Sequence, residues 1–270
     1  MTETSQVNGS LTSRPRRATR GRPPAMPDEE LRRRMFAAAG EMLTEAGGFT
    51  LSFEQINLES IMRRADVSRS AVYRVWPTKE DFNFELLDAF ASIGPGGVEP
   101  FDADGQSVAR TLVAERPELL ETTEGRRTLL MEAIRRVANQ DFQAIIQTRR
   151  WRRYAVLTIA ADGMDEERAE QILGTMRATE ETFYTGYIEF YRSMFELLKL
   201  RPRAPFTDAD AFEALTRMTV ALFHGLSMQH TVNPAVGDTT YLGVGGDWTL
   251  PSLGFLAIVD AVSEPVPEGQ

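Results

Sequence analysis

Residues 67–79 combine basic and hydroxyl-bearing side chains and include no acidic residue. The stretch reads VSRSAVYRVWPTK, with Arg69, Arg74 and Lys79 as its cations. An arginine can form two hydrogen bonds to one guanine, and tyrosine and serine hydroxyls can bind phosphate oxygens. A groove lined with phosphates would therefore meet only positive or neutral groups along this stretch. Its composition favours contact with double-stranded DNA.

Helical spacing predicts which side of this stretch is exposed. Val72 and Trp76 are four residues apart, so they share the inner face of a helix that begins near Ser68 and ends before Pro77. A shorter helix is expected over residues 58–65, followed by a turn at Asp66. Two short helices joined by a tight turn are typical of a helix-turn-helix, whose second helix enters the major groove. The side chains left on the outer surface are Arg69, Ser70, Tyr73 and Arg74.

Two further helices are expected to support this pair. Apolar residues at three- and four-residue spacings predict one that begins at Asp28 and ends at Gly47 and Gly48. Asn57 is the expected N-cap of the short helix, and Thr78 is the expected N-cap of a fourth helix. These elements would hold the basic stretch in place.

The segment LESIMRRADVSRSAVYRVWPTKEDF, residues 58–82, resembles the DNA-binding segment of TetR-family transcriptional regulators. That family has an Ile-Ala pair, an Ala-Gly-Val-Ser turn and a Tyr-x-x-Phe-x-x-Lys run in this order. The residues that match are Ile61, Ala65, Val67, Ser68, Tyr73 and Lys79, while Met62, Asp66, Trp76 and Phe82 depart from the pattern. The resemblance implies that Tyr73 and Lys79 hold phosphates and that Arg69, Ser70 and Ala71 approach bases. The full set of expected contacts in this segment is Ser68, Arg69, Ser70, Ala71, Tyr73, Arg74, Thr78 and Lys79.

An arginine-rich segment precedes these helices. Arg20-Gly21-Arg22-Pro23 resembles the core of an AT-hook, in which Arg20 and Arg22 would follow the floor of a narrow minor groove. The position of the motif directly ahead of a helix-turn-helix favours this interpretation. The alternative is a solvated basic tail without a binding role.

The expected fold is all-α, with three regions. Residues 1–27 contain few large apolar side chains and are expected to be a flexible basic arm. Residues 28–93 would form the helix-turn-helix DNA-binding domain, and residues 94–270 a larger helical domain for ligand binding and dimerisation. Helical periodicity runs over residues 123–160, 166–200, 207–232 and 252–262, without sustained two-residue alternation.

Residues 207–232 carry a bulky apolar stripe and, beside it, a stripe of slimmer residues. Small side chains let a second helix approach closely, so this helix and residues 252–262 are expected to form a homodimer interface. The resemblance implies a four-helix bundle with the partner. The alternative is an ordinary monomeric core. The interface residues predicted are Ala214, Met218, Ala221, Gly225, Phe255 and Val259.

Aromatic residues crowd residues 183–195 and recur on neighbouring helices, which is typical of an apolar effector pocket. The alternative is a plain aromatic core. His224 and His230 are six residues apart and fall on different helix faces, so neither a metal site nor a cofactor is expected. The ligand-binding residues predicted are Trp151, Tyr154, Phe183, Tyr187, Tyr191, Phe223 and His224.

Charge and composition narrow the class of protein. The net charge is −9, but residues 1–80 carry 13 basic and 10 acidic residues, a net +3, whereas residues 81–270 carry 17 and 29, a net −12. The chain has no cysteine and no apolar run of membrane-spanning length, which favours a cytoplasmic protein. The expected function is a ligand-responsive repressor that binds a palindromic operator as a homodimer, and not an enzyme. The alternative is a helical carrier or enzyme with an incidental basic head.

Overall fold

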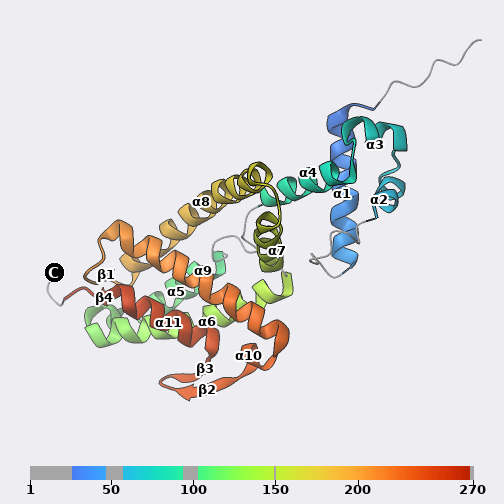
Figure 1. Ribbon diagram of the computed structural model, residues 1–270. Coiled ribbons are helices and arrows are strands. Elements are labelled where there is room, and N and C mark those ends of the chain that lie inside the picture. The colour runs from blue at the N-terminus through green and yellow to red at the C-terminus, as the bar shows by residue number, and fades with distance from the viewer. Residues whose placement is uncertain (1–25, 47–56, 94–102, 149, 268–270) are drawn as a thin grey trace, which may run out of the picture.

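The computed structural model describes residues 26–46, 57–93, 103–148 and 150–267, and these residues are predominantly helical (Figure 1). The all-α fold class is confirmed. The helices are α1 (Asp28–Glu45), α2 (Leu58–Ala65), α3 (Arg69–Val75), α4 (Lys79–Ala91), α5 (Ala103–Glu115), the 3-10 helix η2 (Pro117–Glu121), α6 (Thr123–Thr148), α7 (Arg150–Asp162), α8 (Glu166–Leu197), α9 (Asp208–Val232), α10 (Ala235–Asp238) and α11 (Leu250–Val262).

Side-chain caps fix where the N-terminal helices begin. The Asn57 side chain accepts hydrogen bonds from the backbone at the start of α2, and the Ser68 hydroxyl accepts one at the start of α3. Thr78 and Asp81 form a reciprocal capping box on α4. Between α2 and α3, Asp66 adopts a left-handed conformation with φ 52° and ψ 52°, which aspartate tolerates better than most residues. The predicted caps and the predicted turn are therefore confirmed.

The helices α1 to α4 form an N-terminal unit around a core of their own. Trp76 at the end of α3 stacks edge-on against Phe82 of α4, with ring centroids 5.2 Å apart. This core buries apolar side chains from all four helices, among them Leu31, Met35, Ile61, Val72, Trp76, Phe82 and Leu86.

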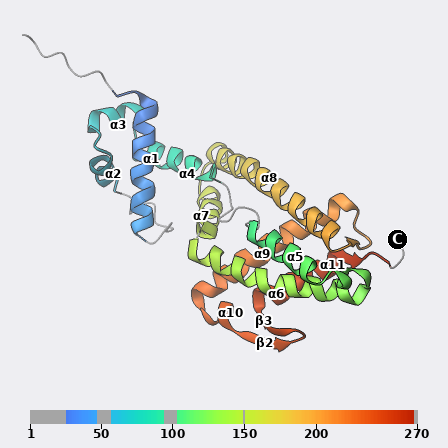
Figure 2. The ribbon, with the colours of Figure 1, turned by 180° about the vertical axis from the view of Figure 1, so that it is seen from behind.

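The remaining described residues, 103–148 and 150–267, form a larger helical body. Its core brings together α6, α8, α9 and α11, and α5 packs along α6 on the side turned toward the viewer in Figure 2. Thr207 caps the start of α9, and both ends of this helix lie close to the predicted limits, residues 207 and 232. Buried residues at the centre of the body include Leu129, Ile134, Phe195, Phe212, Leu215 and Val262.

Helix α4 connects the N-terminal unit to the body (Figure 1). One face of its C-terminal half, with Leu86 and Phe90, stays in the first core, and a neighbouring face packs against α7 and α8. Leu87 and Ala91 of α4 lie in a second cluster of buried residues with Leu157, Ala161, Ile172 and Met176. The two parts of the chain are therefore joined by one helix that belongs to both.

The structure differs from the sequence pattern in three places. Helical periodicity over residues 123–160 corresponds to two helices, α6 and α7. Helix α5 (Ala103–Glu115) lies outside the four stretches with predicted helical periodicity. Two short antiparallel strand pairs are also present. They join β1 (Leu200–Pro202) to β4 (Ser263–Pro265), and β2 (Thr240–Gly243) to β3 (Gly246–Thr249). Strands of three or four residues are too short to show the two-residue alternation by which strands are found in a sequence.

Candidate nucleic-acid interface and ligand cavity

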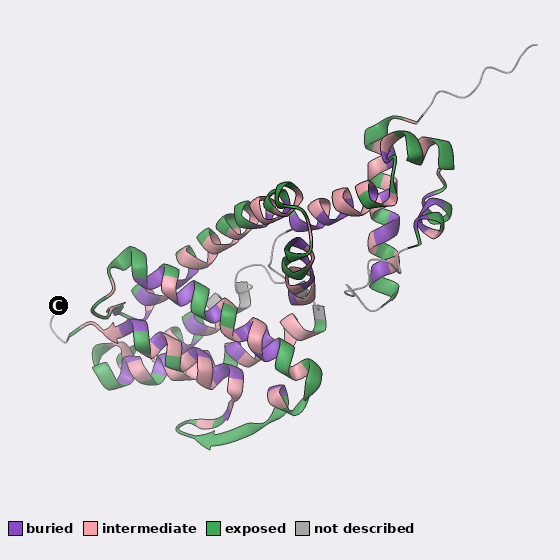
Figure 3. Cartoon of the chain, viewed as in Figure 1, coloured by how far each residue is buried: buried purple, intermediate pink, exposed green. Residues whose placement is uncertain are grey.

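The outer surface of α3 carries the predicted basic and hydroxyl side chains. Val72 and Trp76 are buried in the N-terminal core, which fixes the inner face of the helix as the four-residue spacing predicts. Figure 3 shows exposed residues, in green, along the outer side of α3. The exposed members of the predicted set are Ser68, Arg69, Ser70, Tyr73, Arg74 and Thr78, while Ala71 and Lys79 are half-buried.

Arg69 and Tyr73 lie together on this surface. The Arg69 guanidinium lies 5.3 Å from the centroid of the Tyr73 ring, and it donates to the Glu59 carboxylate of α2 at 3.3 Å. Both partners of this ion pair are well exposed, so the pair is weak and easily exchanged for another acceptor. Arg69 can therefore reach an anionic ligand.

Arg74 is engaged differently. Its guanidinium lies 2.7 Å from the Asp28 carboxylate and 3.4 Å from the backbone oxygen of Met26, so it joins the end of α3 to the start of α1. Thr78 also has a local role, because its hydroxyl donates to Asp81 at 2.7 Å. These two predicted contacts hold the N-terminal unit together in the structure.

Sequence reasoning missed two residues that position α3. The indole nitrogen of buried Trp76 donates to Glu85 of α4 at 2.6 Å. Glu85 also forms an ion pair with Arg32 of α1, whose guanidinium lies 5.8 Å from the centroid of the Trp76 ring. A buried indole N–H requires an acceptor, and this requirement was the signal in the sequence. Arg32 and Glu85 fix the end of α3 against two neighbouring helices.

Arg20 and Arg22 lie outside the described residues, as does most of the predicted flexible arm. The proposed minor-groove contact therefore stays a prediction.

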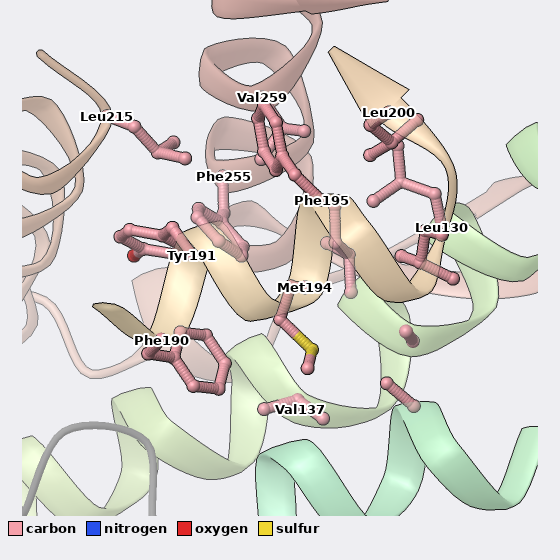
Figure 4. A pocket seen from close by; sticks show the side chains of 14 residues that line it. Leu130, Val137, Phe190, Tyr191, Met194, Phe195, Leu200, Leu215, Phe255 and Val259 are labelled. Atoms are coloured by element: carbon pink, nitrogen blue, oxygen red, sulfur yellow. The ribbon is translucent and has the colours of Figure 1, made fainter. Parts of the chain in front are cut away.

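The body contains an apolar cavity between α5, α6, α8, α9 and α11. Figure 4 shows Met194 of α8 directed toward Val137 of α6 across this space. The centres of water-sized spheres can occupy about 60 Å³ of it, whereas a single water needs roughly 10–15 Å³. The lining residues are Ala109, Leu130, Ala133, Ile134, Val137, Phe190, Tyr191, Met194, Phe195, Leu198, Leu200, Leu215, Phe255 and Val259.

Tyr191 supplies the polar group nearest to this cavity, and none of the described residues that line it is charged. The Tyr191 side chain is fully buried, and this burial raises the pKa of its hydroxyl well above the ordinary value. The phenol is therefore neutral across the physiological range. Apolar walls without a counter-charge suit a neutral, apolar molecule, because a buried charge without a partner is costly.

The structure places only Tyr191, among the predicted ligand-binding residues, in the lining of this cavity. Phe183 and Tyr187 stack on each other along α8, with centroids 4.6 Å apart. Phe223 packs against Phe255 in the core, and Trp151 is buried in α7. The aromatic stripe of α8 therefore continues past the cavity toward α7.

Tyr154 and His224 belong to a separate polar cluster between α7, α8 and α9. Their ring centroids are 5.6 Å apart, and the Tyr154 hydroxyl donates to Glu180 at 2.6 Å. Burial, and then the Glu180 carboxylate, raise the pKa of Tyr154. Burial lowers the pKa of His224, and the negative charge of Glu180 opposes this effect. The cluster is a neutral phenol and a largely buried imidazole beside one carboxylate.

The predicted dimerisation residues separate into two groups. Met218 and Ala221 are exposed on α9, and Ala214 and Gly225 beside them are half-buried. Phe255 and Val259 of α11 are different, because both are buried inside the subunit and line the cavity. Their assignment to a dimer interface is therefore wrong, since the helix turns these side chains toward its own core.

Comparison with known proteins adds no family assignment. No family model, curated protein or solved structure matches the chain. Among the described helices, none combines the length and the apolar character needed to cross a membrane. The candidate roles of the α3 surface and the cavity therefore depend on the chain's own residues.

Proposed function

We propose that the protein is a transcription regulator, a repressor of the TetR type, that binds a palindromic operator as a homodimer and releases it when a small molecule binds in the body. The single observation that carries the proposal is the outer surface of α3. There Arg69, Ser70 and Tyr73 are exposed on a helix that itself contains no acidic residue. Val72 and Trp76 fix the inner face of this helix. A rigid helix with such a surface fits the major groove.

The cavity supports a ligand-responsive function. The cavity lies in the body, and α8 lines it with Phe190, Tyr191, Met194 and Phe195. The same helix also packs against α4. A ligand that prefers one arrangement of α8 would shift α4 and change the separation of the two α3 helices in the dimer. Two recognition helices must lie about 34 Å apart to enter successive major grooves, so a small shift would weaken binding. The resulting coupling between ligand and operator is reciprocal.

The proposal is tested by operator binding. DNA upstream of the protein's own gene, or a sequence selected from random DNA, serves as the target in a fluorescence-anisotropy titration. Replacement of Arg69 and Tyr73 by alanine should abolish specific binding, whereas Arg177→Ala, an exposed arginine on α8, should leave it unchanged. Selection that enriches no sequence would contradict the proposal.

The cavity favours one alternative, a helical carrier or enzyme for an apolar molecule. This alternative predicts that an apolar ligand binds while no DNA sequence is selected. The proposed repressor is a cytoplasmic protein, requires no cofactor and performs no catalysis.

A further inference from the structure

The chain contains a long stretch with almost no charge. Between Met218 and Val259 the only charged residues are Asp238 and Asp247, and there is no lysine or arginine, although 26% of the whole chain is charged. The stretch covers the C-terminal half of α9, the short helix α10, the β2–β3 hairpin and most of α11. Depletion of charge is characteristic of the central part of protein–protein interfaces.

Helix α9 exposes a regular apolar stripe in this stretch. Its residues follow one another at alternating spacings of four and three, which keeps them on one face of the helix. Toward the end of the helix the side chains become larger and more exposed, and Val232 is 89% exposed. The stripe consists of Ala214, Met218, Ala221, Gly225, Met228 and Val232.

The β2–β3 hairpin that follows is firmly anchored at one end. Trp248 of β3 is buried in the core of the body, and its indole nitrogen donates to the backbone oxygen of Val244 at 2.9 Å. Gly243 lies so close to this ring that a Cβ atom there would approach the Trp248 Cδ1 atom to 2.8 Å. Gly245, with φ 83°, provides the left-handed conformation of the turn. The hairpin therefore has a defined conformation.

The same hairpin exposes large apolar side chains. Leu242 is 91% exposed and Val244 is 78% exposed, and Tyr241 is also exposed. Leu242 pairs with Asp247 in the strand register, whereas Tyr241 pairs with Trp248. One face of the hairpin is thus turned to the core through Trp248, and Leu242 lies on the other. Exposed apolar groups of this size on an ordered element are characteristic of an interaction surface.

We infer that the β2–β3 hairpin packs on a second copy of the chain and extends the dimer interface formed by the α9 stripe. The inference rests on the homodimer of the proposed function. The stripe ends at Val232, and only α10 separates it from the hairpin in the chain. Helix α10 packs on α9, and β3 packs on α6 and α11, so both apolar surfaces belong to the same body. In a two-fold dimer both copies present the same surface.

The chemistry of the surface favours this occupant. The stretch itself contributes no lysine or arginine, and Arg135 of α6, which lies close to Gly246, is paired with Glu132. The surface therefore offers nucleic acid or an anionic membrane little electrostatic attraction. Apart from Asp247, which pairs with Leu242 in the strand register, the large exposed side chains of the stripe and the hairpin are apolar. An apolar surface is matched by another of the same kind, which every copy of this chain carries. The α9 stripe alone contains two alanines and a glycine, which offer little area toward the ~1,200–2,000 Å² of a stable interface. The hairpin adds three more large exposed side chains, those of Tyr241, Leu242 and Val244.

Sedimentation equilibrium of the full chain tests the inference. The double variant Leu242→Ser/Val244→Ser should raise the dimer dissociation constant at least about tenfold. The control Ile159→Ser removes an apolar side chain of α7 that is 58% exposed, and it should leave the constant unchanged. Circular dichroism of each variant verifies that the helices are retained. An unchanged dissociation constant for the hairpin variant would overturn the inference.

The absence of cysteine allows a second measurement. A single Leu242→Cys substitution should give a cross-linked dimer with a bifunctional maleimide, whereas Ile159→Cys should not. The wild-type chain can be a dimer while Leu242→Cys gives no cross-link and Leu242→Ser/Val244→Ser does not weaken the dimer. That result refutes only the hairpin contact. A monomeric wild-type chain refutes the homodimer of the proposed function as well. If the wild-type chain co-sediments with anionic vesicles and the Leu242→Ser/Val244→Ser variant does not, the hairpin binds a membrane and the inference is overturned.

Discussion

Arg168 in the first turn of α8 donates a hydrogen bond to Asp81 in the first turn of α4, with 3.1 Å between Nη2 and Oδ1. The same carboxylate also closes the capping box with Thr78 at the start of α4. The Thr78 hydroxyl lowers the pKa of Asp81, and the positive charge of Arg168 lowers it further. The beginning of α8 is thereby joined to the end of α4 that lies nearest to the candidate DNA surface.

This contact predicts energetic coupling between the N-terminal unit and the body. Arg168→Ala and Asp81→Ala should each lower the free energy of unfolding, and the double variant should lose less than the sum of the two. Because both side chains are about a third exposed, the coupling is expected to be small. A double-mutant cycle in urea measures it. The pair Arg177 and Glu170, which is more exposed, serves as the control and should show less coupling. Strict additivity at Arg168 and Asp81 would remove this contact from the route between cavity and operator.

A second prediction concerns the acceptor of the buried indole. Glu85→Leu should lower the free energy of unfolding by about 1–3 kcal/mol, because the Trp76 N–H loses its partner inside the protein. Combining it with Trp76→Phe removes the unsatisfied donor, so the double variant should be less destabilised than the two single changes together. Urea unfolding followed by circular dichroism gives the four values. If Glu85→Leu does not change the free energy of unfolding of the chain that retains Trp76, the hydrogen bond from the indole to Glu85 does not contribute to stability.

The buried imidazole of His224 predicts a dependence of stability on pH. Its pKa in the folded chain is lowered from 6.5 by burial, so the unfolded chain binds a proton more readily. The contribution to stability is therefore complete above the ordinary pKa, and it is lost as the pH falls from that value through the lowered pKa of the folded chain. Urea unfolding at pH 7.5 and 5.5 should show a smaller decrease for His224→Gln than for the wild type. Equal decreases would show that His224 does not titrate in this range.

We expect the cavity to bind neutral ligands in preference to charged ones. Hexan-1-ol should raise the melting temperature, whereas hexanoate should not, because none of the described lining residues carries a positive charge to balance a carboxylate. Ala133→Leu places additional carbon atoms in the lining and should abolish the effect of the alcohol. Thermal unfolding at matched ligand concentrations gives the comparison. Stabilisation by hexanoate alone would place the ligand elsewhere, beside positive charge.

The arginine-rich segment predicts a change in salt dependence. Deletion of residues 1–24 should weaken operator binding and reduce the slope of log affinity against log salt, because fewer counterions are released from the DNA. Anisotropy titrations at several salt concentrations measure this slope. Arg20→Ala/Arg22→Ala in the full chain separates the Arg-Gly-Arg motif from the rest of the segment. An unchanged slope would leave the segment without a part in binding.

The local features of the N-terminal unit could be predicted from the sequence because neighbouring residues determine them. The caps at Asn57 and Thr78, the turn at Asp66 and the inner face with Val72 and Trp76 all depend on spacings of a few residues. The ion pair of Arg74 with Asp28 could not be predicted, because it joins residues distant in the sequence.

The position of the cavity depends on long-range packing even more strongly. Five helices contribute to its lining, and an aromatic stripe such as that of α8 looks the same whether a side chain faces a cavity or a filled core. Phe255 and Val259 show the same difficulty, because a helix that is apolar on most sides does not reveal which side meets the subunit's own core. The short hairpin strands gave no periodic signal at all.

The course of α4 through two cores has a geometric consequence. Leu86 lies in the core of the N-terminal unit, and the next residue, Leu87, lies in the cluster with α7 and α8. One turn further on, Phe90 again belongs to the first core and Ala91 to the second cluster. Since each residue turns an α-helix by about 100°, the same turns of α4 present the two cores on faces separated by that angle. The direction in which α3 faces is therefore determined by the phase of a single helix.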